Sequence, residues 1–134
     1  MTSSEEHKLI IDQFLDDINE KIMHGLLVER QKIVGFSASE ASTNLLEYLL
    51  HKRNLITSGF KVNHNYFASH KRAERYLDFD FPKKKEFIQL MVKQDEFRTL
   101  LCYGKEKNES IVKEAVDNLT RIKQLVENEL GERL

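Results

Sequence analysis

Residues 86–110 read EFIQLMVKQDEFRTLLCYGKEKNES and contain the end of one predicted helix and the start of another. Apolar side chains recur at helical spacing up to Leu101, and Gly104 follows them as a stop signal. A short polar link then leads to Asn108, a residue type that caps helix N-termini. The stretch therefore predicts two helices joined by a tight turn, and the rest of the chain is expected to pack around them.

The helix after Asn108 has the clearest apolar stripe in the chain, and Gly131 ends it. Upstream, Ser3 and Glu6 form a capping-box pattern that opens a first helix, which is expected to end near Gly25. The apolar positions of that first helix are Ile11, Phe14, Leu15, Ile18 and Ile22.

Residues 29–54 are predicted to form one long helix, although residues 37–40 (SASE) also fit a second capping box that would start a helix there. The apolar period runs through this box, which favours the single helix. Its first half carries a stripe of small residues that lets a neighbouring helix approach closely. These residues are Gly35, Ala38, Ser39, Ala41 and Ser42.

Residues 63–78 predict a shorter helix, and Pro82 fits the first turn of the helix that follows. Phe79 and Phe81 are expected to fill the core at the bend between them. The predicted buried contacts of the shorter helix are Phe67, Ala73, Tyr76 and Leu77. Five helices with short connections predict an all-α, up-and-down four- or five-helix bundle, formed as a single domain by residues 1–134.

Composition agrees with a helical protein and excludes several classes. One proline and five glycines leave little material for the turns of an all-β fold, and the single Cys102 excludes a disulfide framework and a cysteine-based zinc site. No apolar run approaches the ~20 residues that span a bilayer, and the N-terminus lacks a signal-peptide pattern. The sequence therefore predicts a cytoplasmic protein without a membrane segment.

Charge is distributed unevenly along the chain. Residues 51–107 have a net charge of +6, from 13 Lys and Arg against 7 Asp and Glu, whereas the flanking segments are acidic. A basic middle segment can attract phosphate groups or dock on acidic helices of another subunit. Cofactor and metal motifs are not found: no Glu-x-x-His pair, P-loop or dinucleotide fingerprint occurs, so no metal or cofactor is predicted.

Gln94 and Arg98 occupy positions on or beside the apolar stripe where Leu or Ile would be expected. A guanidinium there needs a partner, because burying an unpaired charge is unfavourable. Two hypotheses remain open. Either Arg98 pairs with a carboxylate of its own chain, such as Asp95, Glu96 or an acidic residue of the first helix, or it faces a cleft and binds phosphate.

Tyr103 follows Arg98 by five residues and is either a core tyrosine or a second group in that cleft. The segment around residues 63–78 adds polar and basic side chains, which form either a solvated face or a binding surface. These are His64, His70, Lys71, Arg72 and Arg75. Residues 83–85 are three lysines, expected mainly as surface residues.

Two segments resemble the HEPN family (higher eukaryotes and prokaryotes nucleotide-binding domain). VGFSASEASTNLLEYLLHKRN, followed by KVNHNYF, is similar to the family's small-residue-rich second helix and its His-containing loop. EFRTLLCYGKEKNESIVKEAVDNLTRIKQLVE is similar to the stretch that bears an arginine, an aromatic-glycine turn and a last helix. The resemblance implies a homodimer whose motif regions share one cleft. Many members are metal-independent ribonucleases, often toxins neutralised by a nucleotidyltransferase encoded alongside.

The family motif is Arg, four to six residues, then His. Arg98 matches the arginine, but the histidine position holds Tyr103, or Gly104 or Lys105 at the longer spacings. Tyrosine is a poor base near neutrality, since its pKa would need to fall by about three units, roughly 4 kcal/mol. His64 can act as the base instead if its loop folds over the cleft.

The resemblance therefore supports two hypotheses. In the first, a HEPN-like dimer binds RNA or a nucleotide through Arg98 and Tyr103, and its degenerate Arg-x4-Tyr motif gives weakened ribonuclease activity. Further ligand contacts are then expected from Gln94, Lys105, His70, Lys71, Arg72 and Arg75. In the second, the protein is a non-catalytic partner of a nucleotidyltransferase in a toxin–antitoxin module, and the Tyr103 hydroxyl accepts a nucleotidyl group.

Overall fold

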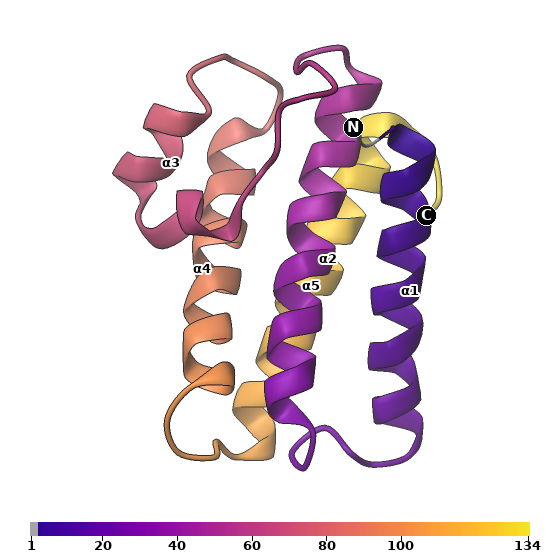
Figure 1. The fold of residues 1–134 in the computed structure, drawn as a ribbon, viewed down its shortest axis with the longest axis vertical. Helices are drawn as coiled ribbons and strands as arrows, with labels where there is room; N and C mark the ends of the chain where they lie inside the picture. The colour runs from indigo at the N-terminus through magenta and orange to yellow at the C-terminus, as the bar shows by residue number, and fades with distance from the viewer. Residues whose placement is uncertain (1–2) are drawn as a thin grey trace.

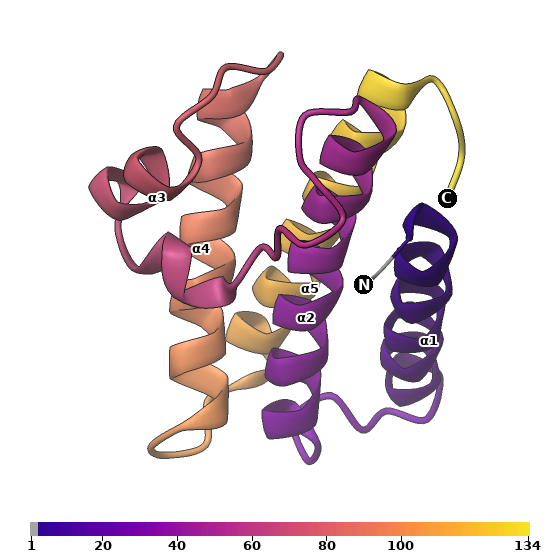
Figure 2. The same ribbon diagram turned by 45° about the horizontal axis from the view of Figure 1, so that its top comes forward.

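Four long helices run alternately down and up along the length of the molecule (Figure 1). The computed structural model describes residues 3–134, and within them the fold is all-helical, as the sequence predicts. The elements are α1 (Ser4–Met23), α2 (Gln31–Lys52), the 3-10 helix η1 (His64–Ala68), α3 (His70–Tyr76), α4 (Lys84–Cys102) and α5 (Glu109–Leu130). α2 is central and packs against α1, α4 and α5. α3 lies on the side of α4 that is away from α1 (Figure 2), whereas η1 packs against α4 and also contacts α2.

The helix ends follow the capping residues in the sequence. The side chain of Ser3 accepts a hydrogen bond from the Glu6 amide, and that of Asn108 accepts one from the Ile111 amide. Gly131 ends α5 in the left-handed conformation, with φ of 67°. α4 ends at Cys102, and Gly104 makes the turn with φ of 79°. These residue types satisfy or redirect backbone groups that the helix itself leaves free.

Residues 31–52 form one continuous helix, so the prediction of a single long α2 is confirmed and the box at residues 37–40 does not start a helix. The small-residue stripe has the expected consequence at Gly35. A Cβ placed on Gly35 would lie 2.7 Å from the Cβ of Leu101 in α4, closer than two carbon atoms tolerate. The glycine therefore sets the close approach of α2 and α4.

The segment 63–78 differs from the prediction. It forms η1 and α3 rather than one helix, because Ser69 is extended and its side chain caps α3 by accepting from the Arg72 amide. Phe67, Ala73 and Leu77 are buried as predicted, but Tyr76 is exposed and stacks on Tyr66.

Two smaller expectations are also wrong. Pro82 precedes α4 instead of lying in its first turn, since the left-handed Lys83 (φ 66°) is the N-cap and Lys84 the first helical residue. Ile22 is exposed near the end of α1, whereas Ile11 and Ile18 are buried. Phe81 does enter the core at the bend, in ring contact with Phe79 and Phe87.

The core extends through the bundle and under η1. Among the described residues, no helix has both the length and the apolar character needed to cross a membrane. The largest side chains that are fully buried include Phe67, Phe87, Leu45, Leu46, Met91, Leu119 and Ile122. α4 packs against α2 and α5, and η1 and α3 contact another part of its surface.

Candidate functional site

Arg98 lies in the interface between α4 and α2. Its Nη1 donates to Ser39 Oγ at 3.3 Å and to Glu40 Oε1 at 3.4 Å, and its guanidinium lies 5.0 Å from the centre of the Phe36 ring. The side chain is 13% exposed. Of the two hypotheses from the sequence, the structure shows the pairing within the chain, and the carboxylate comes from α2 rather than from α4 or the first helix. A phosphate group at Arg98 would have to compete with Glu40.

Gln94 does not reach this surface. It is 1% exposed, and its Nε2 donates to the Ala115 carbonyl of α5. Its Oε1 accepts from Asn118 Nδ2 at 2.8 Å. The expectation that Gln94 contacts a ligand is therefore wrong, since its polar atoms are used inside the bundle.

His64 is placed against α4 by the loop that leads into η1. Its Nδ1 lies 2.9 Å from Asp95 Oδ1, and both side chains are partly exposed. Asp95 precedes Arg98 by three residues on α4, so the two side chains share a face of the helix. The loop thus brings a carboxylate-bound imidazole to the same face of α4 as Arg98. The sequence suggested this placement only as a possibility.

Tyr103 and Lys105 lie beyond the end of α4. Tyr103 is the C-cap residue, with extended backbone angles, and it is 66% exposed. Within the described residues it makes no hydrogen bond to Arg98, so the chain does not turn the phenol back toward the guanidinium. Lys105 is exposed, and its carbonyl accepts from the Lys107 side chain. Burial raises the pKa of the neighbouring Cys102 thiol, although Arg98 opposes the shift.

α3 carries a cationic surface around an exposed aromatic ring. The guanidinium carbons of Arg72 and Arg75 lie 5.7 and 5.8 Å from the centre of the Tyr76 ring. The Tyr66 ring of η1 stacks on the same Tyr76 ring, with 4.3 Å between ring centres. Lys71, Arg72 and Arg75 line a surface hollow with Ser69, and no described carboxylate forms an ion pair with any of the three. His70 is exposed at the start of the same helix.

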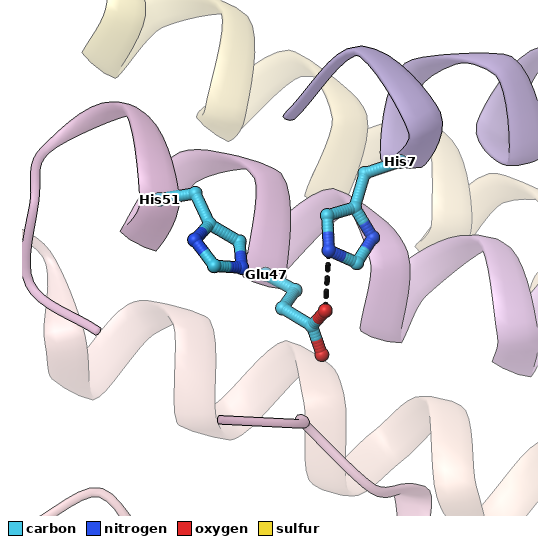
Figure 3. Close-up of side chains that lie close together, drawn as sticks. All are labelled: His7, Glu47 and His51. Atoms are coloured by element: carbon cyan, nitrogen blue, oxygen red, sulfur yellow. Dashed lines mark ion pairs between the residues drawn. The ribbon is translucent and has the colours of Figure 1, made fainter. Parts of the chain in front are cut away.

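A second cluster was missed by the sequence analysis. His7 of α1 and Glu47 and His51 of α2 bring their side chains together near one end of the bundle (Figure 3). His7 Nε2 forms an ion pair with Glu47 Oε2, and His7 Nδ1 lies 2.9 Å from Asn44 Oδ1. The Glu-x-x-His pattern does not describe Glu47 and His51, which are four residues apart. That spacing also places two side chains on one helix face.

The two histidines of this cluster differ electrostatically. Burial on its own would lower the pKa of His7, but the hydrogen bonds to Glu47 and Asn44 outweigh it and the pKa is raised. Burial lowers the pKa of His51, and the adjacent His7 lowers it further. The cluster is the group of His, Cys, Asp and Glu side chains among the described residues that can hold a metal ion.

The chain has no match among protein-family models, curated proteins or solved structures. The chemistry of the candidate site therefore follows from its side chains. η1 places the His64 imidazole beside α4, in contact with Asp95, and α4 itself carries the Arg98 guanidinium, which pairs with Glu40 of α2. The neighbouring α3 presents cations that have no described ion-pair partner, close to the Tyr76 ring. The His64 imidazole, held in one orientation by Asp95, can accept a proton. The basic surface of α3 can attract polyanions.

Proposed function

We propose that the protein is a HEPN-like, RNA-binding protein of the cytoplasm that acts as a homodimer and cleaves RNA without a metal ion. RNA would lie across α3 and η1 and continue along the face of α4 that carries Asp95 and Arg98. The unpaired cations of α3 around the exposed Tyr76 are the observation that carries this proposal.

Single-stranded RNA offers two features that this surface matches. Its phosphates attract Lys71, Arg72 and Arg75, which have no carboxylate partner among the described residues. Its unstacked bases pack on aromatic rings, and Tyr76 is exposed with its stacking partner Tyr66 behind it. Basic residues interleaved with aromatic residues are typical of sequence-tolerant RNA binding.

His64 is the best candidate for the base. Asp95 accepts the proton on Nδ1, which leaves Nε2 able to take the proton of a ribose 2′-hydroxyl. The 2′-oxygen would attack the adjacent phosphorus as the bond to the 5′-oxygen breaks, and that oxygen would take a proton from water. The products are a 2′,3′-cyclic phosphate and a 5′-hydroxyl. Tyr66, two residues from His64, links this base to the α3 surface through its stack on Tyr76.

Arg98 takes part in this scheme only if a phosphate group replaces Glu40 as its partner. Its contact with Glu40 is long, and Glu40 itself is partly exposed. A phosphate oxygen that replaces Glu40 would gain a charge-assisted hydrogen bond, while Phe36 would continue to support the guanidinium. Arg98 would then stabilise the negative charge of the transition state.

Pairing of two copies is supported by exposed apolar side chains beside Arg98. Ile33 and Phe36 lie three residues apart on α2, and both are more than two-fifths exposed. Phe36 also supports the Arg98 guanidinium. A dimer contact through Ile33 and Phe36 would exclude water from these two side chains and bring the two Arg98 side chains near a common groove.

The proposal is tested by fluorescence anisotropy with a labelled, mixed-sequence single-stranded RNA over a range of salt concentrations. Replacing Lys71, Arg72 and Arg75 by Ala is expected to reduce the slope of log affinity against log salt by about 2, since each phosphate contact on a single strand contributes about 0.7. The matched control replaces Lys8, Lys113 and Arg121, which are exposed on α1 and α5 and remove the same charge. Equal slopes in the two variants would refute the RNA surface.

The enzymatic part needs its own assay. Purified protein is incubated with total RNA, and wild type is compared with His64→Ala and Arg98→Ala. Cleavage by wild type and its loss in His64→Ala support the ribonuclease. Identical inactivity of all three proteins removes the enzyme claim and leaves RNA binding to be judged by the salt experiment.

The exposure of Tyr103 favours a second candidate function. A phenol that is 66% exposed at a helix end is accessible to a modifying enzyme. In this alternative the protein is the partner of a nucleotidyltransferase, which transfers a nucleotidyl group to the Tyr103 oxygen and releases pyrophosphate. Mass spectrometry after incubation with a candidate nucleotidyltransferase and ATP tests it, with Tyr103→Phe and Tyr76→Phe as the paired variants.

A further inference from the structure

We propose that His7, Glu47 and His51 bind a zinc ion that ties the start of α1 to the end of α2. One ligand atom from each residue lies within 4.8 Å of the others, and the three side chains converge from two helices (Figure 3). Two imidazoles and one carboxylate form a ligand set that zinc commonly takes, with a fourth position left for water. This inference is independent of the proposed RNA binding.

The ring of His7 is already oriented for coordination through Nε2. Asn44 Nδ2 donates to the Glu40 carbonyl at 2.8 Å, so the Asn44 Oδ1 is the atom that faces His7 Nδ1. That oxygen can only accept, which places the proton of His7 on Nδ1. The lone pair of a neutral His7 is then on Nε2, the atom that points at the cluster. Metal-bound histidines are typically held in this way by an acceptor at the other ring nitrogen.

Glu47 is oriented by the backbone. Its Oε1 accepts a hydrogen bond from the Val62 amide at 2.6 Å, and its Oε2 faces His7 Nε2. His7 is 3% exposed and Glu47 is 5% exposed, so water screens neither the imidazole nor the carboxylate. A lone pair facing a buried carboxylate needs a positive charge between them, which either a proton on Nε2 or a metal ion supplies.

His51 favours the metal over the proton. Its Nε2 is buried and has no hydrogen-bond partner, and its ring stacks on His7 with 5.3 Å between centres. A proton shared by His7 and Glu47 leaves this nitrogen unsatisfied, whereas a metal ion coordinates all three residues at once. Ligand atoms on a tetrahedral zinc lie roughly 3.3 Å apart, so modest side-chain rotations complete the site.

The nature of the ligands selects the ion. Imidazole nitrogen suits zinc and its neighbours in the first transition series, whereas magnesium and calcium prefer sites made of oxygen atoms. The cluster offers two nitrogens and one carboxylate, and no described thiol is part of it. Zn²⁺ is therefore the ion expected, and Co²⁺ can report its geometry through visible absorption.

The test is isothermal titration of metal-free full-length protein with Zn²⁺. Wild type is expected to bind one ion, and His51→Ala to lose affinity at least about 100-fold, the upper end of the effect of losing a supporting partner. His51 is the residue to change because it is the least buried of the three, and circular dichroism establishes that the variant folds. His24→Ala and His70→Ala remove exposed histidines and serve as matched controls.

Two further readouts decide the outcome. Zn²⁺ is expected to raise the melting temperature of wild type and of both controls, but not that of His51→Ala, because the ion links two helices in the folded state only. Co²⁺ should give the intense visible bands of a tetrahedral site in wild type. Equal affinity in wild type and folded His51→Ala, or no stoichiometric binding by wild type, would overturn the proposal.

Discussion

Arg98 of α4 and Glu40 of α2 form an ion pair in which Nη1 and Oε1 are 3.4 Å apart. If RNA phosphate binds Arg98, Glu40 is its competitor. Glu40→Gln is then expected to raise RNA affinity about fivefold, equivalent to about 1 kcal/mol, whereas Arg98→Ala lowers it. Glu20→Gln, an exposed change on α1, has the same charge effect and is the control. Equal affinities of the two Gln variants in the anisotropy assay would show that Arg98 is only structural.

A side chain at Gly35 is expected to destabilise the fold. In Gly35→Ala the new Cβ meets Leu101 Cβ at 2.7 Å, and overpacking of this kind lowers the free energy of unfolding by about 1–3 kcal/mol. The higher helix propensity of alanine offsets about 1 kcal/mol of this loss. Urea denaturation should therefore show a net decrease in the free energy of unfolding on the order of 1 kcal/mol. Gly59→Ala has open space and should be near neutral. Equal stability of the two variants would contradict the packing argument.

Gln94 and Asn118 are expected to contribute to stability and not to ligand binding. Each is 1% exposed, and they hydrogen-bond to each other at 2.8 Å. Gln94→Ala or Asn118→Ala should lower the free energy of unfolding by about 2 kcal/mol, with a coupling of about 1 kcal/mol in the double variant. RNA affinity should stay at the wild-type value. A selective loss of RNA affinity in Gln94→Ala would restore Gln94 to the binding surface.

The helices were predictable because their signals are local. The caps at Ser3 and Asn108 and the stop at Gly131 act within one turn of chain, and the apolar period of residues 29–54 runs through the misleading box at residues 37–40. The error at residues 63–78 has a local cause as well. Ser69 interrupts the helix as a cap, and a serine in the middle of a weak apolar period fits a helix interior and a cap equally well.

The candidate site was less predictable because its partners are distant in sequence. Arg98 finds Glu40 on another helix, and Gln94, one turn away, faces α5 instead. A helical period shows that two residues share a side but not which neighbouring helix covers each one. The cluster of His7 with Glu47 joins residues 40 positions apart, so the sequence offered only the spacing of Glu47 and His51 within one helix.

Tyr48 is expected to make the fold sensitive to alkali. Burial, aided by its 2.5 Å hydrogen bond to Glu132, raises the pKa of Tyr48 to about 12. Tyrosine in the unfolded chain titrates near 10, so the folded state binds this proton more tightly. The contribution to stability is therefore fully present below pH 10 and is lost as the pH rises through 12, by roughly 2 kcal/mol.

Tyr48→Phe lacks this titration, so its free energy of unfolding should fall less steeply than that of wild type between pH 10 and 12. Denaturant melts at several pH values measure both slopes. Tyr76→Phe alters an exposed tyrosine and should follow wild type. Parallel slopes for Tyr48→Phe and wild type would show that the Tyr48 proton is not held by the fold.

Asp95 is expected to affect RNA cleavage far more than RNA binding. In the proposed ribonuclease, Asp95 Oδ1, which lies 2.9 Å from His64 Nδ1, would fix the ring and stabilise the imidazolium that forms when His64 takes a proton. Asp95→Asn keeps the shape but removes the charge, so the cleavage rate should fall by about 100-fold or more while anisotropy gives a nearly unchanged affinity.

Asp117→Asn, an exposed change on α5, controls for the loss of one negative charge. A purely structural Asp95 would lower the melting temperature and reduce cleavage only in proportion to the unfolded fraction. The two cases therefore separate when cleavage is measured well below the melting temperature of both variants. Cleavage at the wild-type rate by folded Asp95→Asn would remove His64 as the base, because a histidine freed from its carboxylate cannot do the same work unchanged.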